Sequence, residues 1–336
     1  MRITRIKLRL IFTLLCLALL FPLQSTAWGK TKQVVFIRYR IAPAHFANVV
    51  QEFKATMAQR GFVEGRDIEY VDVLTRSADQ DSIPDVVAAV RKYKQSADMF
   101  ITCGWISMTA LELLKDTHIP QLFVPVLESV ALEMLPAVNK PPGTNLSGIY
   151  LMYPPEKILR LARLILPGAK KYAYVYDSRI PADLVFKKGY EGLTPPDRHD
   201  FSLSFLDLAA GTDKVVATLA AEKIDAYGGI VGSFKNREAL SASGVPLITS
   251  FTLDIDQTSI EDYAGSDTIA GLFNPFGYCG AQAADMTADI FTGKNTIENT
   301  VPRPAKQVAF INLKAARQRN LPISFDALEA VDIIIK

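Results

Sequence analysis

The sequence has 336 residues, of which 49% are hydrophobic and 21% charged, with 37 basic against 35 acidic side chains. This apolar content excludes a disordered or low-complexity chain, and the near-zero net charge argues against a dedicated nucleic-acid-binding protein. The length exceeds that of one ordinary domain and predicts two.

The first 27 residues predict a secretory signal peptide. Residues 1–9 carry four basic side chains and no acid, residues 10–23 are almost wholly apolar, and Ser25-Thr26-Ala27 supplies small residues for cleavage. A retained membrane anchor is the alternative, but the apolar run is short for a span. Cleavage after Ala27 removes the four basic side chains, so we expect an exported and mildly acidic protein.

Short β-rich runs then alternate with segments of helical periodicity. Strands are predicted over residues 33–37, 68–74, 99–103 and 121–126. The first helix between them is marked by apolar side chains at helical spacing, which are Phe46, Val49, Val50, Phe53 and Met57. Gly61 follows this helix as a stop signal.

A loop signal at residues 140–143 and a strand over residues 146–152 precede a second series of the same kind. The predicted strands of this series are residues 171–176, 201–206, 226–231 and 245–249, with helices near residues 158–165, 182–192 and 215–221. Strands separated by helices imply parallel sheets, so we predict an α/β protein of two doubly wound, Rossmann-like lobes joined near residue 150. In such sheets ligands bind at the carboxyl ends of the strands.

Four segments in order along the chain carry a family resemblance. Residues 61–68, 119–123, 142–148 and 309–316 resemble the GF-x-EG-x-N, IPIVF, PGGNVTG and INLKTA segments of periplasmic substrate-binding proteins of ABC transporters. The resemblance is to the subfamily that includes aromatic-amino-acid-type binding proteins. It spans nearly all of the chain after the signal peptide.

The resemblance implies the type I periplasmic-binding fold, in which three crossovers form a hinge and the lobes close on a ligand. The crossovers would lie near residues 147–153, 271–275 and 304–310. One lobe would then hold residues 32–150 and 275–302, and the other residues 153–272 and 303–336. The resemblance also implies a periplasmic monomer that binds a small molecule, uses no cofactor and meets an inner-membrane ABC permease.

Three segments depart from the family pattern after predicted strands, at residues 38–40, 102–108 and 126–130. We therefore do not carry the family's ligand over. For the loop of Cys103, Gly104, Trp105 and Ser107 we favour ligand contact, because backbone amides at a helix start accept anions. The alternatives are an N-cap by Ser107 and a purely packing role for Trp105.

The remaining candidates of the first lobe are charged. Arg38 and Arg40 flank Tyr39, and either guanidinium could clamp a carboxylate, with surface ion pairing as an equal alternative. Glu128 is suited to hold a ligand ammonium, and capping of the following helix is the alternative.

Candidates of the second lobe and hinge follow the same logic. Asp177 could also hold an ammonium, although a capping role for Asp177 and Ser178 is slightly favoured. Gly232 lies in a glycine-rich segment that fits no nucleotide-binding motif and predicts close backbone approach at the cleft. Further candidates that could surround a ligand, or pack the hinge instead, are Ser250, Phe251, Asp254, Asn274, Phe276 and Tyr278.

No catalytic or metal-binding pattern is present in the sequence. His45, His118 and His199 are scattered. Residues 254–265 have Ser259 and Gly265 at the sixth and twelfth positions, where a calcium loop needs glycine and glutamate. For Cys103 and Cys279, a disulfide and two separate buried thiols both remain open. We expect a binding protein that delivers an amino acid or similar polar ligand to a permease. A sensor module that presents its closed state to a membrane receptor is the alternative.

Overall fold

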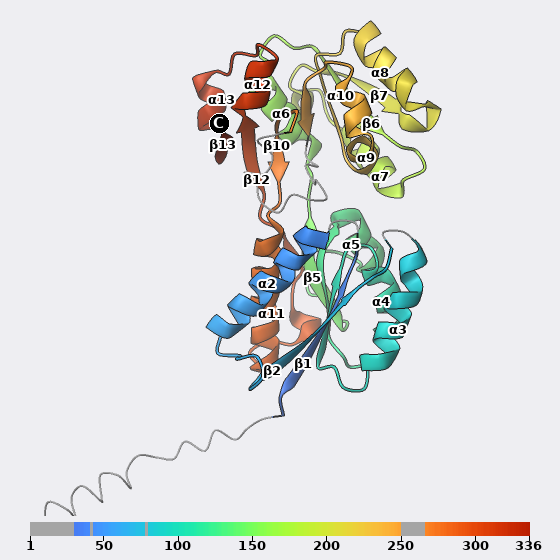
Figure 1. The fold of residues 1–336 in the computed structure, drawn as a ribbon, viewed down its shortest axis with the longest axis vertical. Coiled ribbons are helices and arrows are strands. Elements are labelled where there is room, and N and C mark those ends of the chain that lie inside the picture. The colour runs from blue at the N-terminus through green and yellow to red at the C-terminus, as the bar shows by residue number, and fades with distance from the viewer. Residues whose placement is uncertain (1–29, 41–42, 78–79, 250–265) are drawn as a thin grey trace, which may run out of the picture.

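The computed structural model describes residues 30–40, 43–77, 80–249 and 266–336. The described residues form two sheets, each flanked by helices, and Figure 1 shows them as two lobes stacked along the long axis of the molecule. The predicted signal peptide lies outside the described residues. Within them, no helix is long and apolar enough to cross a membrane.

The first sheet has the strand order β11-β5-β4-β3-β1-β2. Its strands are β1 (Lys32–Arg38), β2 (Ile68–Leu74), β3 (Met99–Cys103), β4 (Gln121–Leu127), β5 (Leu146–Leu151) and β11 (Arg303–Pro304). All pairings are parallel, and β3 and β5 are buried throughout. Continuous apolar runs of this kind are expected of parallel strands that are covered on both faces.

Helices cover both faces of the first sheet. They are α2 (Pro43–Gln59), α3 (Ile83–Tyr93), α4 (Ser107–Leu114), α5 (Glu128–Met134) and α11 (Phe276–Phe291). The apolar stripe predicted for the first helix is buried on α2 and packs against α11, which arrives from late in the chain (Figure 1). Gly280 makes this packing close, because a Cβ added there would lie 2.1 Å from the carbonyl oxygen of Val49.

The second sheet has the strand order β13-β12-β10-β9-β8-β6-β7. Its strands are β6 (Lys171–Tyr176), β7 (Ser202–Asp207), β8 (Ala226–Gly229), β9 (Leu247–Thr249), β10 (Thr268–Phe273), β12 (Val308–Asn312) and β13 (Ile333–Ile335). The pair β10 and β12 is antiparallel and the other pairs are parallel.

Two buried clusters fill the faces of this sheet. One contains side chains from α6 (Pro155–Ile165), α7 (Pro181–Glu191), α12 (Leu313–Gln318) and α13 (Phe325–Glu329). The other contains side chains from α8 (Thr212–Ala221) and α10 (Arg237–Ser241), and the short α9 (Val231–Lys235) follows β8. The predicted strand over residues 226–231 therefore ends earlier, at Gly229.

Three connections join the two lobes. They leave β5 before α6, β10 before α11, and β11 before β12. Hydrogen bonds tie the connections together: Ala305 N donates to Tyr150 O at 2.7 Å, the Gln307 amide to Met152 O at 2.7 Å, and the Asn274 amide to Lys306 O at 3.0 Å. Hydrogen bonds thus join the three hinge segments to one another.

The exact residues at which we predicted each lobe to begin and end stay a prediction. The structure puts β11 in the first sheet, paired with β5 through Arg303 and Pro304. These residues lie just beyond residue 302, where the sequence analysis ended that lobe. A strand of only two residues, one of them a proline, carries too little apolar pattern to be found from the sequence.

Candidate functional site

The carboxyl ends of the parallel strands in the two lobes face one another. In the first sheet β5 ends at a hinge connection, and β1, β3 and β4 run parallel to it. In the second sheet β10 also ends at a hinge connection, and β6, β8 and β9 run parallel to it. The carboxyl ends of these strands therefore point toward the hinge from both sides, between the lobes of Figure 1. This edge is where α/β sheets bind ligands.

Arg38 lies at the end of β1 and is held by an acid of the neighbouring strand. Its Nε and Nη2 donate to the two carboxylate oxygens of Asp72 at 2.7 and 2.8 Å. This two-point geometry is a strong form of ion pair, so the surface-pairing alternative describes Arg38. Arg40 is exposed, and its Nε donates to the carbonyl of Thr75 at 2.9 Å.

Tyr39, Gly104 and Trp105 form one cluster beyond β1 and β3. The Tyr39 ring is buried and meets the half-buried Trp105 ring edge to face, with centroids 5.8 Å apart. Gly104 has a φ of +82°, and an added Cβ would lie 3.1 Å from the Tyr39 ring. A glycine suits this turn because other residues rarely adopt the conformation and would also meet the ring.

Ser107 is fully buried at the first residue of α4. Its hydroxyl donates to the carbonyl of Gly104 at 2.7 Å, and the carbonyl of Thr102 lies 3.1 Å away. The N-cap position is Ile106, so the alternative of an N-cap by Ser107 is wrong. The hydroxyl instead closes the loop from inside, because the carbonyls at the strand end need a donor.

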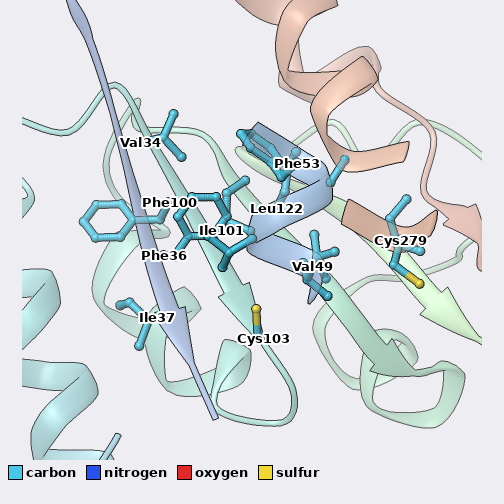
Figure 2. Close-up of a cluster of buried hydrophobic side chains, with 14 of the residues drawn as sticks. Val34, Phe36, Ile37, Val49, Phe53, Phe100, Ile101, Cys103, Leu122 and Cys279 are labelled. Carbon is cyan, nitrogen blue, oxygen red and sulfur yellow. The ribbon is translucent and has the colours of Figure 1, made fainter. Parts of the chain in front are cut away.

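Cys103 and Cys279 are both buried free thiols (Figure 2). Cys103 ends β3 and Cys279 lies in α11, within the same apolar cluster. Burial raises the pKa of both, that of Cys279 to about 12, so both remain protonated thiols at neutral pH. Of the two alternatives that the sequence left open, the structure shows separate thiols.

Glu128 begins α5 directly after β4 and is half buried. Desolvation raises its pKa, and its carboxylate has no cationic partner among the described residues. The charge of Glu128 also raises the pKa of Tyr150, after the larger effect of burial on that phenol. A half-buried carboxylate without a cationic partner is able to bind a cation.

Asp177 and Ser178 follow β6 in the second lobe. Both oxygens of Asp177 pair with Arg179, at 2.8 Å to Nε and 2.6 Å to Nη2, and this pairing lowers the pKa of the buried Asp177 carboxyl. The backbone N–H of Ser178 donates to Asp207 at 3.0 Å. Asp177 therefore already has its cation. The favoured capping role of Asp177 and Ser178 is wrong, because the N-cap position of α7 is Ile180 and no side chain caps it.

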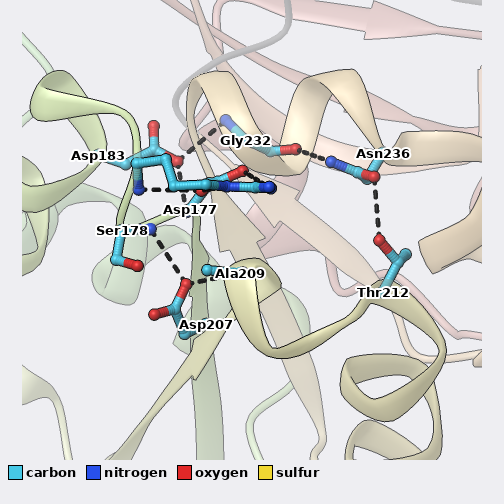
Figure 3. Close-up of polar contacts among 9 residues, drawn as sticks. Asp177, Ser178, Asp183, Asp207, Ala209, Thr212, Gly232 and Asn236 are labelled. Atoms are coloured by element: carbon cyan, nitrogen blue, oxygen red, sulfur yellow. Dashed lines mark hydrogen bonds and ion pairs between the residues drawn. The ribbon is translucent and has the colours of Figure 1, made fainter.

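Asp183 is a residue that sequence reasoning missed. It lies in the first turn of α7, is fully buried, and accepts backbone N–H groups of Asp177, Val231 and Gly232 at 2.8, 3.0 and 3.0 Å. Figure 3 shows Asp183 beside Asp177 and Gly232. The close approach predicted for Gly232 is present, because an added Cβ would lie 2.5 Å from Asp183 Oδ2. A single acid in a helical segment gives no sign that its partners are so distant in sequence.

The hinge candidates have mainly packing roles. Asn274 is buried and bonds Lys306 as described, and its Oδ1 has no hydrogen-bond partner among the described residues. Phe276 is buried against the rings of His45 and Phe46, with centroids 5.4 and 5.3 Å away. Tyr278 is exposed and lies under the Lys306 ammonium at 4.5 Å. Ser250, Phe251 and Asp254 lie outside the described residues.

A metal site finds no support at these strand ends among the described residues, and the apolar cavity of the second lobe lies elsewhere. In the described part of the chain, no three His, Cys, Asp or Glu side chains are grouped so as to hold a metal ion. An apolar cavity of about 560 Å³ lies at the opposite edge of the second sheet. Its lining comes from the segment before β6 (Ile165, Leu166 and Pro167), from Pro246 before β9, and from Leu321 and Ile323 after α12.

Solved structures share this two-lobe arrangement at low sequence identity. A conserved domain protein from Vibrio cholerae O1 biovar El Tor is 21% identical with a TM-score of 0.71, and covers 91% of this chain and 100% of its own. A Streptococcus pneumoniae ABC domain in complex with L-Trp is 14% identical with a TM-score of 0.71 over the same shares. The chain has the type I periplasmic-binding fold.

Other structures with this type I periplasmic-binding fold differ in what they hold. A ligand-free, open substrate-binding protein from Clostridium difficile is 16% identical, with a TM-score of 0.72, and covers 91% of this chain and 99% of its own. Others were solved with benzoate, D-allose or myo-inositol. No protein-family model and no curated protein sequence matches the chain. The predicted fold class is confirmed, including the three-crossover hinge.

Proposed function

We propose that this protein is a periplasmic solute-binding protein that closes its lobes on a small polar ligand and delivers it to an ABC permease. The observation that carries the proposal is the meeting of two sets of strand ends across a hinge of three bonded segments. Hinge closure around a ligand is the established motion of such two-lobe architectures. The signal peptide predicted at residues 1–27 supports export, and the substrate-binding proteins among the similar structures support a transport role.

An amino acid or a similar amine is the ligand class that we propose. Glu128 is the candidate for the ammonium, since the acids Asp72, Asp177 and Asp207 at the same edges already have partners. Residues 41–42, 78–79 and 250–265 contain no lysine, arginine or histidine that could neutralise it. Trp105 supplies a partly exposed aromatic wall, and the exposed Arg40 a candidate for an anionic end.

We further propose that the protein binds without catalysing a reaction. The solved structures with the same fold that name a role are binding or transporter proteins, which supports this reading. The titratable groups at the strand ends are engaged in loop contacts or, for Glu128, placed to supply a single charge. A binding role needs only a charge such as that of Glu128 and a surface that fits the ligand.

A thermal-shift screen tests the ligand class. Wild-type protein would be heated with amino acids, with the matching decarboxylated amines, and with the matching deaminated acids. Amino acids and amines are expected to raise the melting temperature, because a ligand that binds only the folded state stabilises it. No shift with any amino acid, amine or other polar metabolite would refute the proposed ligand class.

Two variants locate the cation site within this screen. Glu128→Gln should weaken binding of every amine at least about ten-fold, since a charged hydrogen bond contributes on the order of 1.5–3 kcal/mol. Glu133→Gln lies on the exposed side of the same helix and serves as the matched control. Equal losses in both variants would argue against a specific contact with Glu128.

A further inference from the structure

Asp183 joins two loops at the strand ends of the second lobe that the chain itself keeps far apart. The loop after β6 contributes the N–H of Asp177, and the start of α9 after β8 contributes those of Val231 and Gly232. Oδ2 accepts from Asp177 and Gly232, and Oδ1 accepts from Val231. One side chain therefore fixes the distance between these two loops (Figure 3).

The packing around Asp183 leaves little room for another arrangement of the loops after β6 and β8. A Cβ on Gly232 would lie 2.5 Å from Asp183 Oδ2 and 2.8 Å from the Cβ of Asp177. The Gly232 carbonyl accepts from Asn236 at 2.9 Å, and Thr212 donates to the Asn236 side chain at 3.1 Å. The Asp183 contact thus continues into a chain of bonds that reaches the start of α8.

The charges around Asp183 are few. From β6 and its loop come the Tyr174 hydroxyl, which donates to the Asp183 carbonyl at 3.2 Å, and the Asp177 carboxylate, which Arg179 neutralises. From α9 comes Lys235, whose charge acts on Asp177. Burial raises the pKa of Asp183 to about 6 against the opposing effect of its three N–H donors, so mild acid is enough to protonate it.

We propose that Asp183 is a positioning residue for ligand capture: its carboxylate holds the loops after β6 and β8 in the geometry that binds, and protonation releases them. This inference rests on the proposed binding function. A carboxylate offers two acceptor oxygens, whereas the protonated group turns one oxygen into a donor that faces N–H groups. At least one of the three bonds is then lost.

Hydrogen exchange in the ligand-free protein tests the contact. In wild type, the amides of Val231 and Gly232 should lose at least about ten-fold of their protection between pH 7.5 and pH 5, after correction for intrinsic exchange. In Asp183→Asn they should be weakly protected at both pH values, because the amide NH₂ faces backbone donors. Asp207→Asn is the matched control, since Asp207 accepts from Ser178 and Ala209 and not from α9.

Wild-type protection that is equal at both pH values would overturn the proposal without recourse to any variant. Affinity supplies the second readout, with an amino acid or amine that stabilises wild type in the screen above. Asp183→Asn should weaken its binding about ten-fold at pH 7.5 and flatten the pH profile of the dissociation constant. If exchange changes but affinity does not, Asp183 is only structural. If no compound binds wild type while exchange behaves as expected, the proposed function fails instead.

Discussion

At the scale of single residues, the strand ends are organised by acids that already have partners. Asp72 holds Arg38, Asp177 holds Arg179, and Asp183 holds three backbone N–H groups. Partnered acids of this kind fix loop geometry and have little capacity left for a ligand. Glu128 stands out because its charge is only partly hydrated and has no such partner among the described residues.

Gly232 should tolerate no side chain. Gly232→Ala is expected to cost at least about 2 kcal/mol of unfolding free energy, since its Cβ would collide with both Asp183 and Asp177. Gly168→Ala is the control, because nothing lies within 4 Å of an added Cβ there. Urea unfolding of both variants gives the comparison, and similar costs would show that steric collision is not the cause.

The two buried thiols should not react with thiol reagents in the folded protein. Cys103 and Cys279 are fully buried and their pKa values are raised, so a thiol reagent such as DTNB should modify neither at pH 8. Both should react once the protein is unfolded in urea. Rapid modification of the native protein, or two missing thiols after unfolding, would contradict the structure.

These residue-scale features also show where sequence reasoning stops. The positions of Arg38, Ser107 and Asp177 at strand ends followed from the apolar pattern, but their partners did not. Asp183 and Gly232 are 49 residues apart in sequence, and an acid in the first turn of a helix is ordinarily a surface residue. Only the packing of α7 and α9 against β6 turns this acid into a buried one.

At the scale of elements, the packing of α2 on α11 depends on glycine at one helical position. Gly280→Ala should cost about 1–3 kcal/mol, because the new Cβ would press on the backbone of Val49. Gly277→Ala in the same helix meets only the flexible side chain of Glu52, at 2.9 Å. It should be neutral or stabilise by up to about 1 kcal/mol through helix propensity. Thermal unfolding monitored by circular dichroism decides between them, and the reverse order would refute this packing.

Most elements were predictable because their apolar periodicity is strong and local. The buried stripe of α2 and the continuous apolar strands β1, β3 and β4 agree with the predicted spans to within a few residues. The extent of the short α5, the two-residue β11 and the start of α9 after β8 were not predicted. Their limits are set by contacts with the neighbouring lobe or loop rather than by their own pattern.

At the scale of the whole molecule, Phe186 links the two lobes. Its side chain packs against the buried cluster of each lobe and lies 5.8 Å from the Tyr153 ring in the first hinge connection. One helical turn further along α7, an added Cβ on Gly189 would lie 3.3 Å from Pro155. This side of α7 therefore lies against the first hinge connection and the start of α6.

Removal of the Phe186 ring should destabilise the protein and widen the range of lobe separations. Phe186→Ala is expected to lower the unfolding free energy by about 1–3 kcal/mol and to broaden the distribution of lobe separations, because a partly buried aromatic contact is lost. Small-angle X-ray scattering of the ligand-free protein measures the separation. Lys188→Ala, on the exposed side of the same helix, should leave both quantities unchanged. Unaltered scattering in Phe186→Ala would show that the hinge segments alone set the lobe angle.

The three hinge connections also bear on how the chain is made. Because α11 and β11 belong to the first lobe, that lobe stays incomplete until residue 304 has been synthesised. Before that point the apolar face of α2, with Phe46, Val49 and Phe53, has no α11 to cover it. The native core of the first lobe can thus form only after residues 155–273, which make most of the second lobe, have been synthesised.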